Sequence, residues 1–141
     1  MPGSPMSGQV SLINDRDQIN AIQDLVVEQA EEFGFPSGAL FALRLAVEEA
    51  IVNAFRHGHR DLPAETPISI EYTLSPERIH VAVEDRGPGF TPAAVPDPTL
   101  DENLENPGGR GLVLMRAYMS QVRYNDRGNR VEMELLMPDE V

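Results

Sequence analysis

The stretch VEEAIVNAFRHG, residues 47–58, lies in the most strongly helical part of this 141-residue chain, and it decides which fold the rest of the sequence supports. In a helix predicted over residues 39–57, apolar side chains recur on one face, which we expect to pack against the core. Glu49 and Asn53 are four residues apart outside that face, so they form either an ordinary solvated pair or one side of a site. The apolar face consists of Leu40, Leu43, Val47, Ala50, Ile51 and Ala54.

The composition limits what the protein can bind. A chain of this length fits one domain. The net charge of -12, from 23 acidic and 11 basic residues, argues against a nucleic-acid partner. Every basic residue is arginine, which excludes a Walker A loop, the strand lysine of protein kinases and a Schiff-base lysine. Cysteine is absent and no run of about 18 apolar residues occurs, so we expect a cytoplasmic protein that binds no membrane.

Proline, glycine and turn residues divide the chain into short elements. Residues 1–9 are rich in Pro, Gly and Ser and are predicted to be a disordered tail, and residues 10–141 are predicted to form a single domain. Ser37 is a candidate cap for the second helix. Periodicity predicts a first strand at QVSLI, helices over residues 15–33, 39–57 and 110–120, and further strands over residues 67–74, 79–85, 121–126 and 129–137.

The order of these elements predicts the fold class. The last four strands form two pairs, and their short connections, SPER and RG, are typical of hairpins. Between the pairs, residues 91–109 carry four prolines and little periodicity, as long functional loops do. We therefore expect an α+β domain with two layers, in which helices pack on one face of a mainly antiparallel mixed sheet.

Two glycine clusters add chemistry to this frame. EDRGPGF, residues 84–90, places Asp85 at a strand end before Gly87 and Gly89, where a carboxylate can accept a hydrogen bond from an exocyclic amine. GGRGL, residues 108–112, is a glycine-rich entry into a helix, where free N–H groups suit a polyphosphate. Each cluster alone is more often an ordinary turn or loop end than a binding site.

In this order and spacing, the motifs resemble those of the GHKL superfamily of ATP-binding domains, shared by bacterial histidine kinases, type II topoisomerases and MutL. The resemblance is strongest to its stand-alone branch, the anti-sigma-factor serine kinases of the RsbW and SpoIIAB type. EEAIVNAFRHG is similar to the N box and DRGPGF to the first glycine box. DPTLDENLENPGGRGLVLMR is similar to the lid and the second glycine box. The resemblance implies the two-layer Bergerat fold, with residues 91–109 as its lid.

The resemblance also implies a role for each matching residue. Glu49 would be the general base, and Asn53 would bind Mg²⁺ through its amide oxygen. Asp85 would bind the adenine amine of ATP, and Gly87 and Gly89 would let the ring approach the backbone. The phosphates would be held by Gly109, Arg110, Gly111 and Leu112.

The function implied first is a Mg²⁺-ATP-dependent serine/threonine kinase. It would phosphorylate an anti-anti-sigma protein of the STAS type and control a sigma factor by partner switching. Two alternatives are an ATP-loaded module that binds a sigma factor with little or no catalysis, and a slow ATPase. The resemblance further suggests a homodimer. Candidate contacts are Leu12, Ile13, Leu25 and Val26, which ordinary core packing explains as well.

Overall fold

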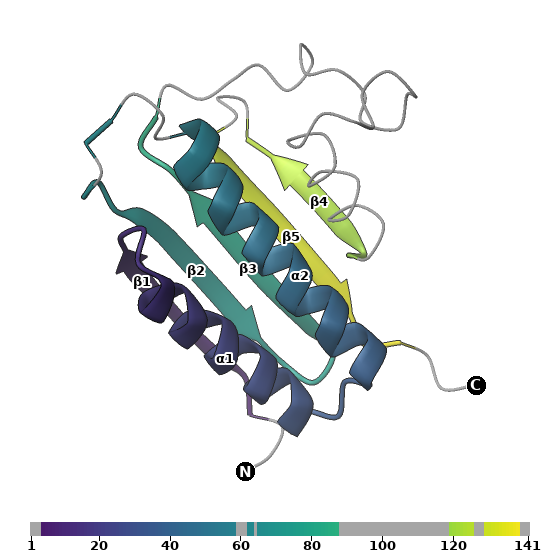
Figure 1. Ribbon diagram of the computed structural model, residues 1–141. Coiled ribbons are helices and arrows are strands. Elements are labelled where there is room, and N and C mark those ends of the chain that lie inside the picture. Colours follow the sequence, from purple (N-terminus) through teal and green to yellow (C-terminus); the bar gives the residue numbers. More distant parts are fainter. Residues whose placement is uncertain (1–3, 59–61, 64, 88–118, 126–128, 139–141) are drawn as a thin grey trace.

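One antiparallel sheet carries helices on one of its faces (Figure 1). The computed structural model describes residues 4–58, 62–63, 65–87, 119–125 and 129–138 of the chain. Within these residues the sheet has five strands in the order β1-β2-β3-β5-β4, and every pairing is antiparallel. The elements are β1 (Met6–Leu12), α1 (Arg16–Glu32), α2 (Ser37–Asn53), η1 (Ala54–Gly58), β2 (Ile68–Leu74), β3 (Arg78–Glu84), β4 (Gln121–Tyr124) and β5 (Arg130–Leu136).

Alternation of apolar and polar residues, interrupted at Ala82 and Leu136, gives the sheet one apolar buried face. Residues Ile70, Val81 and Met133 of neighbouring strands are each 0% exposed. The residues between them, such as Glu71 and Glu132, belong to the opposite, polar face. Helices α1 and α2 cover the apolar face, so the core lies between the two layers (Figure 1). The predicted α+β class and two-layer arrangement are confirmed.

Both predicted hairpins are present. In the SPER turn, the backbone N–H of Ser75 donates to the carbonyl oxygen of Arg78 at 2.9 Å. The Ser75 hydroxyl oxygen accepts from the N–H of Arg78 at 3.2 Å, which closes the turn between β2 and β3 from both sides. Strands β4 and β5 also pair antiparallel, with Val122 opposite Met133.

Helix α1 begins and ends as the sequence predicts. The carboxylate of Asp15 accepts a hydrogen bond from the N–H of Gln18 at 3.1 Å and caps the first turn. The helix ends at Glu32, and Gly34 follows with a φ of 99°, a left-handed conformation that glycine adopts without strain.

Strand β1 corrects the predicted tail. Its residues from Met6 to Gln9 were expected to be disordered, but they pair with β2. The pairing places Gly8 opposite Tyr72, and a Cβ atom on Gly8 would lie 2.6 Å from the Cζ atom of the Tyr72 ring. The ring therefore covers the bare glycine, and this long-range contact outweighs a local composition that is typical of disorder.

Helix α2 differs from its prediction at both ends. It begins at Ser37 with Pro36 as the cap, and no side-chain hydrogen bond caps it, so the predicted capping role of Ser37 is wrong. Its α-helical part ends at Asn53 and continues as a π-helical turn, η1, instead of running to residue 57. The predicted apolar face is buried except for Leu40, which is partly buried at its edge.

The predicted helix over residues 110–120 lies outside the described residues, apart from Met119 and Ser120, which form a bend before β4. Among the helices that the structure describes, none combines the length and apolar character that a bilayer span requires.

Adjacent leucines in β5 test the two faces of the sheet. Leu135 is 6% exposed and Leu136 is 51% exposed. We expect Leu135→Ala to lower the free energy of unfolding by about 2–5 kcal/mol, because it leaves a cavity in the core. Leu136→Ala should change it by less than about 0.5 kcal/mol. Urea unfolding of both variants measures the difference, and equal losses would contradict the assignment of faces.

Candidate functional site

Glu49 and Asn53 lie on one face of α2, near the end of the helix, as predicted. Both are partly buried. Neither side chain forms a hydrogen bond or an ion pair with any residue that the structure describes. A half-buried carboxylate and amide without such partners are available to bind something else.

The neighbouring Glu48 has a different role. Its carboxylate accepts two hydrogen bonds from the guanidinium of Arg16, each at 2.9 Å. It also accepts one at 2.7 Å from the amide of Gln23, which is 3% exposed. Glu48 therefore ties α2 to α1, and its contacts differ from those of the adjacent Glu49.

Asn53 lies where the helix changes its hydrogen-bonding pattern. The N–H of Ala54 is shared between the carbonyl oxygens of Ala50 and Ile51, and the π-helical turn η1 follows. Such turns are rare and frequently occur at functional sites. This turn is not predictable from the sequence, because the pattern of apolar residues continues the α-helical period.

Asp85 follows the last residue of β3. Its carboxylate oxygen Oδ1 accepts a hydrogen bond from the backbone N–H of Gly87 at 2.8 Å, and Gly87 is buried. This is an Asx turn, which holds the carboxylate in one orientation. The other residues predicted for this region and for the phosphates, namely Gly89, Gly109, Arg110, Gly111 and Leu112, lie outside the described residues, as does the lid over residues 91–109.

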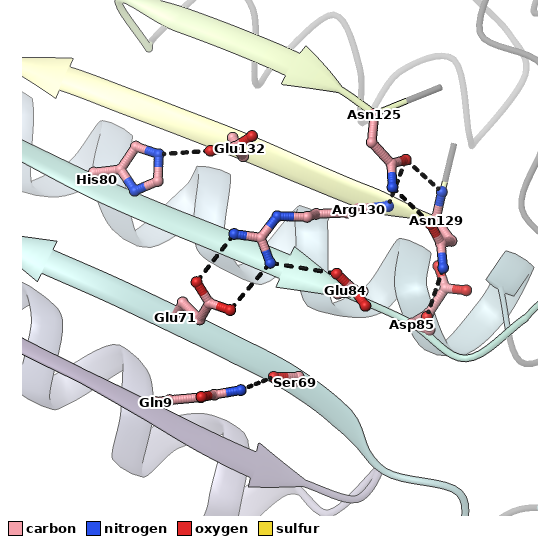
Figure 2. A network of polar contacts seen from close by, with 10 residues as sticks. All are labelled: Gln9, Ser69, Glu71, His80, Glu84, Asp85, Asn125, Asn129, Arg130 and Glu132. Carbon is pink, nitrogen blue, oxygen red and sulfur yellow. Dashed lines mark hydrogen bonds and ion pairs between the residues drawn. The ribbon is translucent and has the colours of Figure 1, made fainter. Parts of the chain in front are cut away.

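Two asparagines that the sequence did not identify contact this strand end (Figure 2). The side-chain Nδ2 of Asn129 donates to the carbonyl oxygen of Asp85 at 3.2 Å. The amide of Asn125 donates to Oδ1 of Asn129 at 2.9 Å. Their sequence, NDRGN, signals a turn but carries no information about the distant segment that the turn contacts.

An arginine links the same strand end to the rest of the polar face (Figure 2). Arg130 donates to Glu84 at 3.3 Å and to both carboxylate oxygens of Glu71, at 3.3 and 3.1 Å. The hydrogen bond from Arg130 and its positive charge hold the pKa of Glu71 below its ordinary value. The same hydrogen bond raises the pKa of Arg130.

The ends of α2 and β3 lie at the same end of the domain (Figure 1). Helix α2 packs directly on β3 and β5; Asn53 is its last residue, and Asp85 directly follows the last residue of β3. Within the described residues, no group of three or more His, Asp or Glu side chains is arranged to hold a metal ion by itself.

A protein-family model described as "Histidine kinase-like ATPase domain" matches residues 12–135. The match contains α1, α2, β2, β3 and β4 in full, β5 as far as Leu135, and only Leu12 of β1.

Named relatives include bacterial protein kinases. The chain is 31% identical over 104 residues to the serine-protein kinase RsbW of Oceanobacillus iheyensis, which is 70% of this chain and 65% of that protein. It is 34% identical over 93 residues to the serine/threonine-protein kinase BtrW of Bordetella bronchiseptica, 62% of each chain. The RsbW of Listeria monocytogenes is 31% identical over 111 residues, 74% of this chain and 70% of that protein. The chain thus spans less than two thirds of the first two relatives.

A solved structure has the same fold. The RsbU and RsbW domains of a Mycobacterium tuberculosis protein match 94% of this chain and 31% of that chain, with a TM-score of 0.59 and 17% sequence identity. The resemblance that the sequence motifs carry is confirmed by the family match and by the RsbW relatives.

The ion pair of Glu71 predicts an acid-dependent contribution to stability. Because the folded pKa of Glu71 lies below the unfolded one, its contribution is fully present above about pH 4.5 and is lost as the pH falls through the lowered folded value. The Glu71 side chain is 47% exposed, so we expect Glu71→Gln to cost less than about 1 kcal/mol at pH 7.

Urea unfolding at pH 7 and at pH 3.5 compares the wild type with this variant. The difference between them should shrink at the lower pH. Glu77→Gln, an exposed position in the turn between β2 and β3, is the control. A difference between wild type and Glu71→Gln that does not change with pH would contradict the assignment.

Proposed function

Because the chain belongs to the family of histidine kinase-like ATPase domains, we propose that it binds ATP and transfers the γ-phosphoryl group to a serine or threonine of a partner protein. The relatives RsbW, a serine-protein kinase, and BtrW, a serine/threonine-protein kinase, support the acceptor class. The observation that carries the proposal is the pair Glu49 and Asn53, which share a helix face and are not engaged by described side chains.

Glu49 takes the proton in this reaction. The hydroxyl oxygen of the acceptor forms a bond to the γ-phosphorus of ATP while the bond from that phosphorus to the β–γ bridging oxygen breaks. The proton of the hydroxyl passes to the carboxylate of Glu49, and ADP leaves with the electron pair of the broken bond. The carboxylate of Glu48 is occupied by hydrogen bonds from Arg16 and Gln23, whereas that of Glu49 has no partner among the described residues, and this difference supports Glu49 as the base.

Asn53 fits a magnesium ligand. Magnesium takes one or two protein groups and completes its shell with phosphate oxygens and water. A neutral amide at a helix end, without a described side-chain partner, meets this limited demand. When bound, the ion would neutralise charge on the phosphates.

Asp85 would accept a hydrogen bond from the adenine amine, and the Asx turn with Gly87, which restricts the orientation of the carboxylate, supports this role. The phosphates would bind at Gly109, Arg110, Gly111 and Leu112, and the ring would approach Gly89. These assignments rest on the family motifs.

The protein partners proposed are an anti-anti-sigma protein of the STAS type and a sigma factor, in a partner switch. The homodimer and the cytoplasmic location stay predictions. Of the four candidate dimer contacts, Leu12 and Val26 belong to the core, whereas Ile13 and Leu25 are 36% and 38% exposed. If a dimer forms through this region, the two exposed residues are the ones available to it.

Glu49→Gln tests the kinase. We expect it to lower transfer of label from γ-labelled ATP by at least about a hundredfold, because the hydroxyl proton loses its acceptor. The assay adds purified protein, Mg²⁺ and labelled ATP to a lysate of the source organism and follows label on a small protein. Glu48→Gln is the matched control: it should lower stability by about 1 kcal/mol and keep transfer.

The same assay separates the alternatives. Label that persists in Glu49→Gln would contradict the base assignment. Wild-type protein that binds ATP without labelling any protein would favour the nucleotide-loaded binding module, and release of free phosphate without a labelled protein would favour a slow ATPase.

Asn53→Ala tests the magnesium ligand. In the wild type we expect Mg²⁺ to increase the affinity for ATP, measured by titration calorimetry with and without EDTA. In the variant this increase should shrink by about tenfold or more, because the protein's amide ligand is lost. Affinity in EDTA should be nearly equal for both proteins. An unchanged magnesium effect would show that Asn53 is not the ligand.

A further inference from the structure

The turn between β4 and β5 holds the backbone of Asp85 at two points. The N–H of Asp85 donates to the backbone carbonyl oxygen of Asn129 at 2.8 Å. The carbonyl oxygen of Asp85 accepts from the side-chain Nδ2 of Asn129 at 3.2 Å. One residue therefore satisfies both backbone polar groups of Asp85, immediately after β3 ends.

Asn125 sets the orientation of the Asn129 amide. Its Oδ1 accepts from the backbone N–H groups of Asn129, at 3.1 Å, and of Arg130, at 3.2 Å. Because Oδ1 is fixed as the acceptor, Nδ2 of Asn125 faces Oδ1 of Asn129 and donates to it at 2.9 Å. Nδ2 of Asn129 is then the atom that faces Asp85. Turning either amide over would place donor against donor or acceptor against acceptor.

The arrangement is buried enough to be rigid. Asn129 is only 8% exposed, so losing one of its hydrogen bonds would leave a polar group without water to replace the partner. The Asp85 side chain is fixed separately, through its hydrogen bond from Gly87. Backbone and carboxylate of Asp85 are thus held by different groups, and Figure 2 shows the contact of the backbone with Asn129.

We propose that Asn129, oriented by Asn125, is a positioning residue that sets the selectivity of the site for adenine. This inference rests on the proposed function, in which the Asp85 carboxylate accepts from the adenine amine. In this role the two asparagines act through Asp85 and do not contact the nucleotide themselves. They hold the strand end from which Asp85 reaches it, so their loss should affect recognition of the amine more than binding of the rest of the nucleotide.

Asn125→Asp is the sharpest test. The new carboxylate still accepts from the two backbone N–H groups, so the turn keeps its bonds. It no longer donates to Asn129, whose amide should turn over and present an oxygen to the carbonyl of Asp85. Asn129→Asp removes the same donor directly. Asn14→Asp adds an equal charge at an exposed position before α1 and serves as the control.

The readout compares ATP with purine riboside triphosphate, which lacks the exocyclic amine. In the wild type and in Asn14→Asp we expect ATP to bind more tightly. In Asn125→Asp and Asn129→Asp, affinity for ATP should fall by about three- to tenfold while affinity for the other nucleotide is nearly unchanged. Thermal unfolding of each variant establishes that it is folded.

The outcomes separate this inference from the proposed function. Folded variants that keep the wild-type preference for ATP, or that lose affinity for both nucleotides by the same factor, would overturn the positioning role and leave ATP binding intact. Wild-type protein without affinity for ATP would overturn the proposed function and this inference with it.

Discussion

Burial of the apolar face of α2 against the sheet fixes the rotation of that helix about its axis, and the rest of the candidate site depends on this setting. With Leu43, Val47 and Ile51 fully buried, Glu48 is turned toward α1 and Glu49 toward the opposite flank. Helical geometry then places Asn53 one turn beyond Glu49 on the same flank. A substitution in the core face that rotated the helix would change the surroundings of both Glu48 and Glu49. The position of the proposed base therefore depends on the packing of the core.

The second constraint is the pairing of β3 with β5. Antiparallel pairing of Glu84 with Arg130 brings the residue after β3 and the residue before β5 into contact, which is how Asn129 reaches Asp85. Arg130 adds ion pairs to Glu84 and Glu71 on the polar face of the same strands. Two adjacent residues therefore connect the polar face of the sheet with the candidate site: Arg130 pairs with the glutamates of the polar face, and Asn129 contacts Asp85.

Most of the fold follows from local patterns, and the exceptions have a common cause. The start of α1 at Asp15, the SPER hairpin and the apolar face of α2 each depend on residues a few positions apart, so they were predictable. The strand that begins at Met6 depends on Tyr72, and the hydrogen bond that holds the backbone of Asp85 comes from Asn129, 44 positions away. Composition and periodicity carry no information about such distant contacts. Glu49, Asn53 and Asp85 were found because the family motifs carry what a single sequence pattern does not.

The charge of the protein limits how a nucleotide is held. A chain with a net charge of -12 repels a triphosphate at long range, and the arginines of the described helices and strands are largely committed: Arg16, Arg44, Arg78 and Arg130 are each ion-paired with a carboxylate. Long-range attraction by the protein as a whole thus cannot supply the affinity. It has to come from short-range contacts, which are backbone N–H groups, Arg110 and a magnesium ion for the phosphates, and a rigidly held carboxylate for the base. Short-range contacts require accurate placement of the groups that make them. In an acidic protein, the hydrogen bonds by which Asn129 holds the backbone of Asp85 therefore matter for nucleotide binding.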